Sequence, residues 1–459
     1  MSEQKYSIVL RDCRLLGAGD RETVDIAIED DTIAAVSPRI SGLGDREIDI
    51  KGKLVCPPFV ESHIHLDSAL TAGEPRWNQS GTLFEGIQIW GQRKQGLTLN
   101  DVKKRAIETL RLQASQGILF VRSHADVSEP TLTALQGLLE VREEVKDWMT
   151  LQVVAFPQDG IYGSPGNDKL LDKSLDMGAD AVGGIPHYEL TREDGVKSVH
   201  RIFELAEKYN KLIDIHCDEI DDEQSRFLEV VAACAIRSGA GSRVTASHTT
   251  AFGSYNNAYA FKLMGILQKS GINFIANPLI NITLQGRADS YPKRRGVTRV
   301  KELWQHGLNV SLGHDCVQDP WYSLGTGNML DVAHMAVHVC QMTGMAEIAA
   351  CFNMVTVNGA KTLYLGDDNY GIDAGKPANL IVLDAEDCYD AIRRRAAVRY
   401  GSSGFAVTNK ANMSCKPFLA RVSLIKKFRN CIQTQKSLRY VISRGKLLAE
   451  TVPAKTCFF

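Results

Sequence analysis

The chain has 459 residues, of which 44% are hydrophobic and 23% are charged, and its net charge is −1. These proportions are ordinary for a globular protein, and the length allows one large core or two smaller ones. The near-zero charge gives no sign of a surface for nucleic acid or for an anionic membrane. No run of about 18 apolar residues is free of charge, and the polar amino-terminal stretch lacks the apolar core of a signal peptide. We therefore expect a cytoplasmic protein without a membrane-spanning segment.

Short alternating strands, broken by glycine and acidic turns, fill residues 7–37. Similar patterns return near the other end of the chain, at 371–385 and 439–450. We therefore predict a small β-domain that is built from both ends of the chain. Its predicted parts are residues 1–55, 366–400 and 439–459.

The middle of the chain, residues 56–365, alternates apolar β-rich runs with helix-like stretches such as 101–117 and 196–210. This alternation indicates a parallel sheet with helical crossovers. Eight such units fit a closed (β/α)8 barrel, an α/β fold whose active site lies at the carboxyl ends of the strands. The predicted strands are 54–65, 118–124, 151–158, 179–187, 212–216, 243–248, 272–279 and 308–314.

Polar side chains gather at the ends of these strands. In the stretch FVESHIHLDS, His63 and His65 lie two positions apart, so both side chains point to the same side of a strand. A lone histidine at a strand end is usually structural, but six of the eleven histidines lie at these ends, which indicates a metal site. The polar residues at the strand ends are His63, His65, His124, Gln158, His187, His216, His248 and Asp315.

A barrel can surround one ion only with ligands from separate strands, and four of these side chains offer such a set. They are His63, His65, His216 and Asp315. Three imidazoles and one carboxylate suit a single Zn²⁺ or Fe²⁺ ion and leave room for water. A divalent ion can lower the pKa of water from about 15.7 to about 7, which gives hydroxide at neutral pH. No lysine lies near the end of the third or fourth predicted strand, so a binuclear site bridged by a modified lysine is disfavoured.

The stretch HCDEIDDE offers a proton carrier, because Glu219 follows His216 by three residues. A carboxyl group near the metal can take a proton from water and pass it to a substrate nitrogen. The alternative is a solvated loop carboxylate, since this loop is rich in acidic residues.

Residues 401–438 carry seven Lys or Arg and no Asp or Glu. We predict that they form a basic insertion near the β-domain. A contact surface and a loosely docked loop are the two alternatives for its role.

Six motifs resemble the bacterial cytosine deaminases of the amidohydrolase superfamily over about residues 5–400 and 439–455: FVESHIHLD, VAFPQDGI, HCDEIDDEQSRF, ASHTTA, INFIANPLINITLQGR and LGHDCVQDPWYSLGTGNML. The resemblance implies a distorted (β/α)8 barrel of TIM type with a small β-sandwich domain. It also implies a homo-oligomer with one Zn²⁺ or Fe²⁺ ion per subunit and a free nucleobase as substrate.

The resemblance assigns roles to the matching positions. The implied metal ligands are His63, His65, His216 and Asp315. Glu219 would protonate ring N3 as metal-bound hydroxide attacks C4, while His248 and Asp315 would orient and deprotonate the attacking water and help ammonia leave.

Further implied roles concern the substrate ring. Gln158 would hydrogen-bond the amide edge of the pyrimidine, since its carboxamide both donates and accepts. Trp321 and Leu83 would pack against the ring. His124 and His187 would support the site or the barrel without binding the metal.

One departure from the related deaminases concerns the residue after Asp315. The related enzymes have a second aspartate there, close to C5 of the substrate, whereas this chain has Cys316. A thiol removes a charge and makes the wall smaller and more apolar, and burying one methyl group there gains roughly 0.8 kcal/mol. The hypothesis is therefore a deaminase that converts 5-methylcytosine to thymine, or cytosine to uracil, with neutral drift as the alternative for Cys316.

Two other functions stay open at this point. Isoguanine, or another ring with an amidine-like carbon, presents the same N–C–NH₂ unit, and an inactive barrel scaffold is a non-enzymatic alternative. Deaminases that act on nucleic acid use a P-C-x-x-C motif, which this chain lacks, so we expect no nucleic-acid partner.

Overall fold

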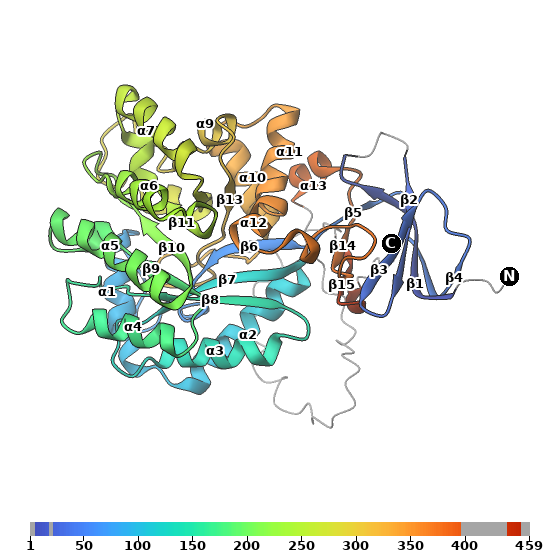
Figure 1. The fold of residues 1–459 in the computed structure, drawn as a ribbon, viewed down its shortest axis with the longest axis horizontal. Helices are drawn as coiled ribbons and strands as arrows, with labels where there is room; N and C mark the ends of the chain where they lie inside the picture. The colour runs from blue at the N-terminus through green and yellow to red at the C-terminus, as the bar shows by residue number, and fades with distance from the viewer. Residues whose placement is uncertain (1–4, 18–21, 396–437, 451–459) are drawn as a thin grey trace, which may run out of the picture.

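The computed structural model describes residues 5–17, 22–395 and 438–450. Figure 1 shows a barrel surrounded by helices and, beside it, a sheet that contains strands from both ends of the chain. This arrangement confirms the predicted α/β barrel with a β-domain built from both termini. The predicted basic insertion, 401–438, lies outside the described residues except for Leu438, where a strand begins.

The terminal sheet follows the order β16-β15-β14-β5-β1-β2-β3, with β4 paired to β1. Strand β1 changes partners along its length: it pairs with β2 and β4 first and with β5 at its end. An irregularity between Leu10 and Cys13 marks this change, as expected where a bulge bends a strand. The strands are β1 (Lys5–Leu15), β2 (Val24–Glu29), β3 (Thr32–Ser37), β4 (Leu43–Asp49), β5 (Leu54–Cys56), β14 (Leu380–Leu383), β15 (Leu438–Ser443) and β16 (Lys446–Glu450).

The barrel consists of eight parallel strands that follow one another in chain order, as the sequence predicted. Their positions agree with the apolar runs, and the neighbouring strands are joined by ladders from β6 to β13. The strands are β6 (Phe59–Ile64), β7 (Ile118–Asp126), β8 (Thr150–Phe156), β9 (Ala181–Gly184), β10 (Leu212–Cys217), β11 (Val244–His248), β12 (Asn273–Ala276) and β13 (Val310–Leu312).

The first predicted strand, 54–65, is wrong in one respect, because the structure divides it in two. Its first part is β5, which pairs with β1 and β14 in the terminal sheet. Its second part is β6, which begins the barrel. Pro57 and Pro58 lie between them, and proline cannot donate the ladder hydrogen bond that a continuous central strand requires.

Helices connect successive barrel strands and cover the outside of the barrel (Figure 1). The two predicted helices, 101–117 and 196–210, are confirmed as α2 and α5. In α5, Thr191 caps the amino terminus by accepting a hydrogen bond from the backbone N–H of Asp194. The helices are α1 (Leu83–Arg93), α2 (Leu99–Ser115), α3 (Thr133–Val145), α4 (Asn167–Asp176), α5 (Arg192–Tyr209), α6 (Phe227–Ser238), α7 (Asn257–Ser270), α8 (Pro278–Leu284), α9 (Val300–Gln305), α10 (Met329–Val339), α11 (Met345–Met354), α12 (Val357–Thr362) and α13 (Cys388–Arg394).

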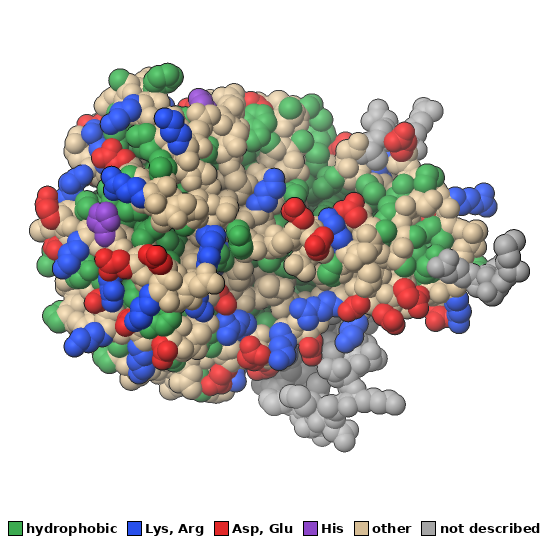
Figure 2. Space-filling model, in the orientation of Figure 1, with side chains coloured by type: hydrophobic (Ala, Val, Ile, Leu, Met, Phe, Trp, Pro, Cys, Tyr) green, Lys and Arg blue, Asp and Glu red, His purple; other side chains and the backbone are tan. Residues whose placement is uncertain are grey.

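Within the described ranges, no helix combines the length and the apolar character that crossing a membrane requires. On the face shown in Figure 2, acidic and basic side chains are interspersed rather than gathered by sign.

The barrel closes between β13 and β6 by a short contact at the carboxyl ends of these strands. The backbone N–H of Asp315 donates to the carbonyl of His63 at 2.8 Å, and the N–H of His65 donates to the carbonyl of Asp315 at 3.1 Å. The side chain of Glu61, which is fully buried, reinforces this seam. Its Oε1 accepts from the N–H of His63 at 3.2 Å and from the N–H of His314 at 2.9 Å.

We expect Glu61→Ala to lower the free energy of unfolding by about 2–4 kcal/mol, because two buried backbone N–H groups lose their acceptor. Glu61→Gln keeps the accepting oxygen and should stay within about 1 kcal/mol of the wild type. Urea unfolding of both variants in the presence of a chelator measures the difference. An alanine variant as stable as the glutamine variant would contradict the role of Glu61 at the seam.

Candidate metal centre and active site

Four side chains predicted as metal ligands meet at the carboxyl end of the barrel. His65 Nε2 lies 3.1 Å from His216 Nε2 and 3.5 Å from Asp315 Oδ1. His63 Nε2 lies 3.6 Å from the same carboxylate oxygen and has no hydrogen-bond partner. All four side chains are buried, with at most 7% of any residue exposed.

The spacing of these atoms fits a small cation. Ligand atoms about 2.1 Å from a tetrahedrally bound ion lie roughly 3.4 Å from one another, and the distances above bracket this value. The unpartnered Nε2 of His63 is a second sign, because a buried nitrogen without a partner is costly unless something else binds it. The residues therefore fit one divalent ion.

Burial shifts the pKa values of the three histidines and of Asp315 in opposite directions. It lowers the pKa values of His63, His65 and His216, and the neighbouring imidazoles lower them further. Burial, together with the nearby carboxylates of Glu219 and Asp319, raises the pKa of Asp315. When no metal is bound, these shifts favour neutral imidazoles, with lone pairs available, and a protonated carboxyl group at Asp315.

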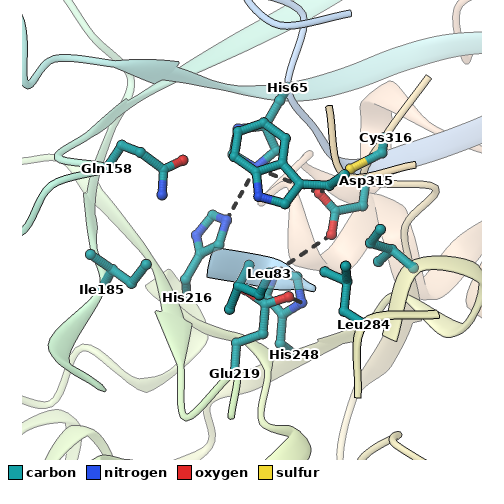
Figure 3. A pocket seen from close by; sticks show the side chains of 12 residues that line it. His65, Leu83, Gln158, Ile185, His216, Glu219, His248, Leu284, Asp315 and Cys316 are labelled. Atoms are coloured by element: carbon teal, nitrogen blue, oxygen red, sulfur yellow. Dashed lines mark hydrogen bonds and ion pairs between the residues drawn. The ribbon is translucent and has the colours of Figure 1, made fainter. Parts of the chain in front are cut away.

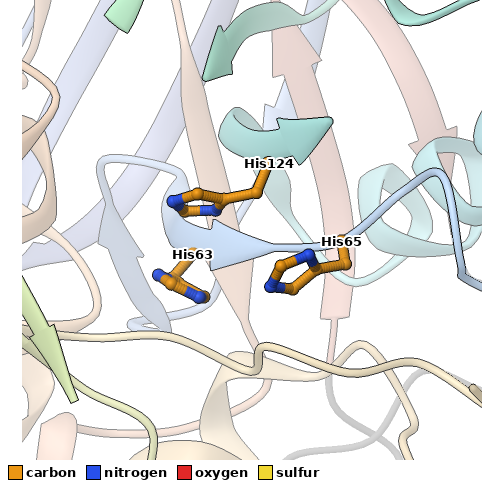
Figure 4. Close-up of side chains that lie close together, drawn as sticks. All are labelled: His63, His65 and His124. Atoms are coloured by element: carbon orange, nitrogen blue, oxygen red, sulfur yellow. The ribbon is translucent and has the colours of Figure 1, made fainter. Parts of the chain in front are cut away.

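His124 lies beside the ligand cluster. Its ring centroid is 4.1 Å from that of His63, and Figure 4 shows the two rings next to each other on adjacent strands. A nitrogen of His124 also forms a group with nitrogens of His63 and His65 in which all atoms lie within 4.8 Å of one another. The cluster therefore offers an alternative set of three imidazoles, which the sequence did not predict.

Glu219, His248 and Asp315 form a connected row across the site. His248 Nδ1 lies 3.1 Å from Glu219 Oε1, and His248 Nε2 lies 3.7 Å from Asp315 Oδ2. Burial raises the pKa of Glu219 to about 8, so at neutral pH this carboxyl group carries a proton. The row can therefore hold and transfer protons from one end to the other.

The backbone and two asparagines fix the position of His248. Its φ is 67°, and that of Asp315 is 68°, a left-handed conformation that is uncommon for residues other than glycine. The amide nitrogen of Asn281 lies 3.0 Å from Nδ1 of His248, and that of Asn277 lies 3.3 Å away. Strained backbone of this kind concentrates at functional sites, where the surrounding structure holds it in place.

A pocket lies over this cluster. Figure 3 shows Gln158 on one side of the pocket and Cys316 on the opposite side, with Glu219 and His248 between them at the base. The carboxamide of Gln158 makes no hydrogen bond with another group of the described chain, although the residue is only 5% exposed. It is therefore available to a ligand.

The wall around Cys316 is apolar. Cys316 is 3% exposed and belongs to a cluster with Ile280, Leu284 and Trp321. Its Sγ lies 3.7 Å from Asp315 Oδ1, and burial raises the pKa of this thiol well above its usual value. The thiol therefore stays protonated and acts as part of an apolar surface.

Leu83 and Trp321 form another part of the pocket lining. Leu83 is the first residue of α1, and the next turn of this helix rests on the indole of Trp321. A Cβ atom at Gly86 would lie 2.2 Å from Cδ1 of the indole, so only glycine permits this approach.

The structure thus brings the predicted residues to one pocket or to the cluster directly beneath it. His187, in contrast, does not line the pocket. Sequence reasoning missed the apolar side chains of Ile185, Ile280 and Leu284. The spacing of Ile280 and Leu284, four residues apart in the short helix α8, is the signal that both point to one side.

Comparisons with known proteins agree with this geometry. A family model described as the amidohydrolase family matches residues 46–449. Structures of 5-methylcytosine deaminase from Klebsiella pneumoniae, liganded with phosphonocytosine or with 5-fluorocytosine, are 44% identical in sequence with a TM-score of 0.86. They cover 98% of this chain and 100% or 99% of their own.

Two curated relatives carry other names. N-isopropylammelide isopropyl amidohydrolase of Pseudomonas sp. (strain ADP) is 30% identical over 387 residues, which are 83% of this chain and 91% of that protein. Pterin deaminase of Rhizobium rhizogenes (strain K84 / ATCC BAA-868) is 28% identical over 369 residues, which are 79% of this chain and 82% of that protein.

Replacing one histidine at a time distinguishes the two possible ligand sets. We expect His216→Ala to weaken zinc binding by roughly tenfold or more, whereas His124→Ala, a matched change at the end of a nearby strand, should retain about one equivalent of metal after dialysis. Metal analysis of the purified variants gives the result. The reverse pattern would place the ion among His63, His65 and His124.

Zinc binding should release a proton at pH values below the raised pKa of Asp315, because this carboxyl group must ionise to bind the ion. The apparent affinity should therefore rise with pH, by about tenfold per pH unit for each proton released, until pH exceeds the raised pKa of Asp315. The neutral histidines add no protons to this balance above pH 6.5. Calorimetry in buffers of different ionisation enthalpy counts the protons, and a binding enthalpy that does not depend on the buffer would contradict the expectation.

Proposed function

Since this chain belongs to the amidohydrolase family, we propose that it is a metal-dependent deaminase of a free pyrimidine base. It is an enzyme that hydrolyses C–N bonds, as the family match and the 44% identical structures support. The proposed reaction converts 5-methylcytosine to thymine and ammonia, with cytosine to uracil as the second reaction. The observation that carries the proposal is the position of Gln158 and Cys316 on opposite sides of one small pocket over the histidine cluster.

The ring geometry of a pyrimidine matches this arrangement. The C2 carbonyl and C5 are diametrically opposite on the six-membered ring. If the carboxamide of Gln158 binds the amide edge at N1 and C2, C5 points to the far wall, which is Cys316. The N3–C4 edge then faces Glu219 and the cluster at the base, where the amino group must be replaced.

His63, His65, His216 and Asp315 are the residues that would hold the ion, and their spacing suits Zn²⁺ or Fe²⁺. When bound, one such ion per subunit would supply a water molecule whose pKa is near 7.

The chain itself supplies the proton transfers. Of the two protons of the attacking water, one ends on ring N3 and the other leaves with the amino group as ammonia. Glu219, whose pKa is raised to about 8, can deliver the proton to N3. His248 lies between Glu219 and Asp315, and so can pass the second proton toward the departing nitrogen.

The apolar wall supports a substituent at C5. A methyl group there would contact the sulfur of Cys316 and its neighbours Ile280 and Leu284, and burying it gains roughly 0.8 kcal/mol. A carboxylate at the same position would lose hydration against a methyl group. The 44% identical structures, named as a 5-methylcytosine deaminase, favour the same substrate.

The test is a comparison of kcat/KM for 5-methylcytosine and cytosine with zinc- and iron-loaded protein, measured as ammonia release. The wild type should favour 5-methylcytosine. Cys316→Asp should change the ratio toward cytosine by at least about tenfold, which corresponds to roughly 1.4 kcal/mol, while Cys316→Ser, the uncharged control, should change it less.

Three outcomes would overturn the proposal. If kcat/KM of the wild type for cytosine exceeds that for 5-methylcytosine by more than tenfold, Cys316 and its apolar neighbours do not have the proposed role of binding a methyl group at C5. Faster release of ammonia from isoguanine or pterin, or isopropylamine from N-isopropylammelide, would assign the pocket to another ring. Fully loaded protein that attacks none of these compounds would favour the inactive scaffold.

A further inference from the structure

We infer that Ser247 and Asp214 are positioning residues that set the tautomer of His63, so that its Nε2 lone pair faces the cation. The inference rests on the proposed metal-binding role of His63. Neither Ser247 nor Asp214 lines the pocket.

The three side chains form a continuous chain of contacts beneath the site. Ser247 Oγ lies 2.6 Å from Asp214 Oδ1, and His63 Nδ1 lies 3.2 Å from the same Ser247 Oγ. All three residues are fully buried. The register of the barrel produces this contact, because Ser247 pairs with His216 in the ladder between β10 and β11, and Asp214 lies two residues before His216.

The number of available protons sets the direction of each hydrogen bond. Arg122 Nη1 donates to Asp214 Oδ2 at 2.9 Å, and a guanidinium can only donate, so Asp214 accepts on this side. The other oxygen of Asp214 accepts the single proton of the Ser247 hydroxyl. Ser247 can then only accept from His63, and Nδ1 of His63 must carry the proton.

This assignment leaves Nε2 of His63 as a lone pair. The same nitrogen has no hydrogen-bond partner and lies 3.6 Å from Asp315 Oδ1, in the ligand cluster. Metal-bound histidines commonly donate their other N–H group to a neighbouring acceptor, which fixes the ring and its tautomer. Here the acceptor is the hydroxyl of Ser247 on β11, whose own proton is held by the carboxylate of Asp214 on the neighbouring strand β10.

Asp214→Asn should change His63 to its other tautomer, with the proton on Nε2, rather than merely weaken the preference for the first. The amide would turn its oxygen to Arg122, which can only donate, and its N–H to Ser247. The serine hydroxyl would then donate to Nδ1 of His63, and the proton of the ring would move to Nε2, where it blocks the metal.

The experiment measures zinc affinity by competition with a chromophoric chelator, without substrate. We expect Ser247→Ala to weaken zinc binding 10- to 100-fold and Asp214→Asn to weaken it at least as much. The matched control is Ser311→Ala, which removes another fully buried barrel hydroxyl that contacts Thr362 and the carbonyl of Phe274 but no histidine. This control should stay within about threefold of the wild type.

Cobalt supplies a second readout, because the d–d absorption of bound Co²⁺ reports the ligand geometry. It should change in Ser247→Ala and Asp214→Asn but not in Ser311→Ala. Thermal unfolding of the metal-free proteins shows whether each variant is folded; should Ser247→Ala not fold, Asp214→Asn carries the test alone.

The inference fails if the wild type binds zinc and the folded Ser247→Ala or Asp214→Asn variant binds it as tightly as the Ser311→Ala control. A wild type that binds no zinc would overturn the proposed function, and this inference with it. The affinity of the wild type thus separates the two failures.

Discussion

Two backbone hydrogen bonds between residues 63–65 and Asp315 close the barrel, and the site depends on them. They join the first strand of the barrel to the segment that follows the last strand. The side chains of the same residues, His63, His65 and Asp315, converge on the cation position. The ligand geometry is therefore a consequence of barrel closure. Because the buried carboxyl group of Glu61 holds the main chain on both sides of this seam, the site and the fold share one set of contacts.

The residues that transfer protons and the residues that select the ring lie on different sides of the pocket. The proton-transferring row of Glu219, His248 and Asp315 lies at the base, where desolvation determines which groups hold protons. The apolar cluster of Cys316 with Ile280 and Leu284 lies at the side and carries no charge. A change in that wall can alter the accepted ring, which agrees with the different substrates named for relatives of similar length.

Sequence reasoning predicted the barrel and the convergence of His63, His65, His216 and Asp315, because strand alternation and parallel connectivity are local patterns with a defined geometric outcome. It treated residues 54–65 as one strand, since an apolar run does not show that its two parts will pair in different sheets. The nearness of His124 to His63 depends on side-chain packing between strands. The contact of Ser247 with Asp214 depends on inter-strand register, which a single sequence does not contain.

The distribution of protons in the cluster has a consequence for how a doubly charged ion enters a water-free interior. Transferring such an ion from water into a medium of low polarity is normally prohibitive. Here the imidazoles, whose pKa values burial lowers, add little positive charge, while the carboxyl group of Asp315, whose pKa burial raises, can surrender its proton as the ion arrives. Loading then exchanges part of the incoming charge for a proton instead of adding all of it to the interior.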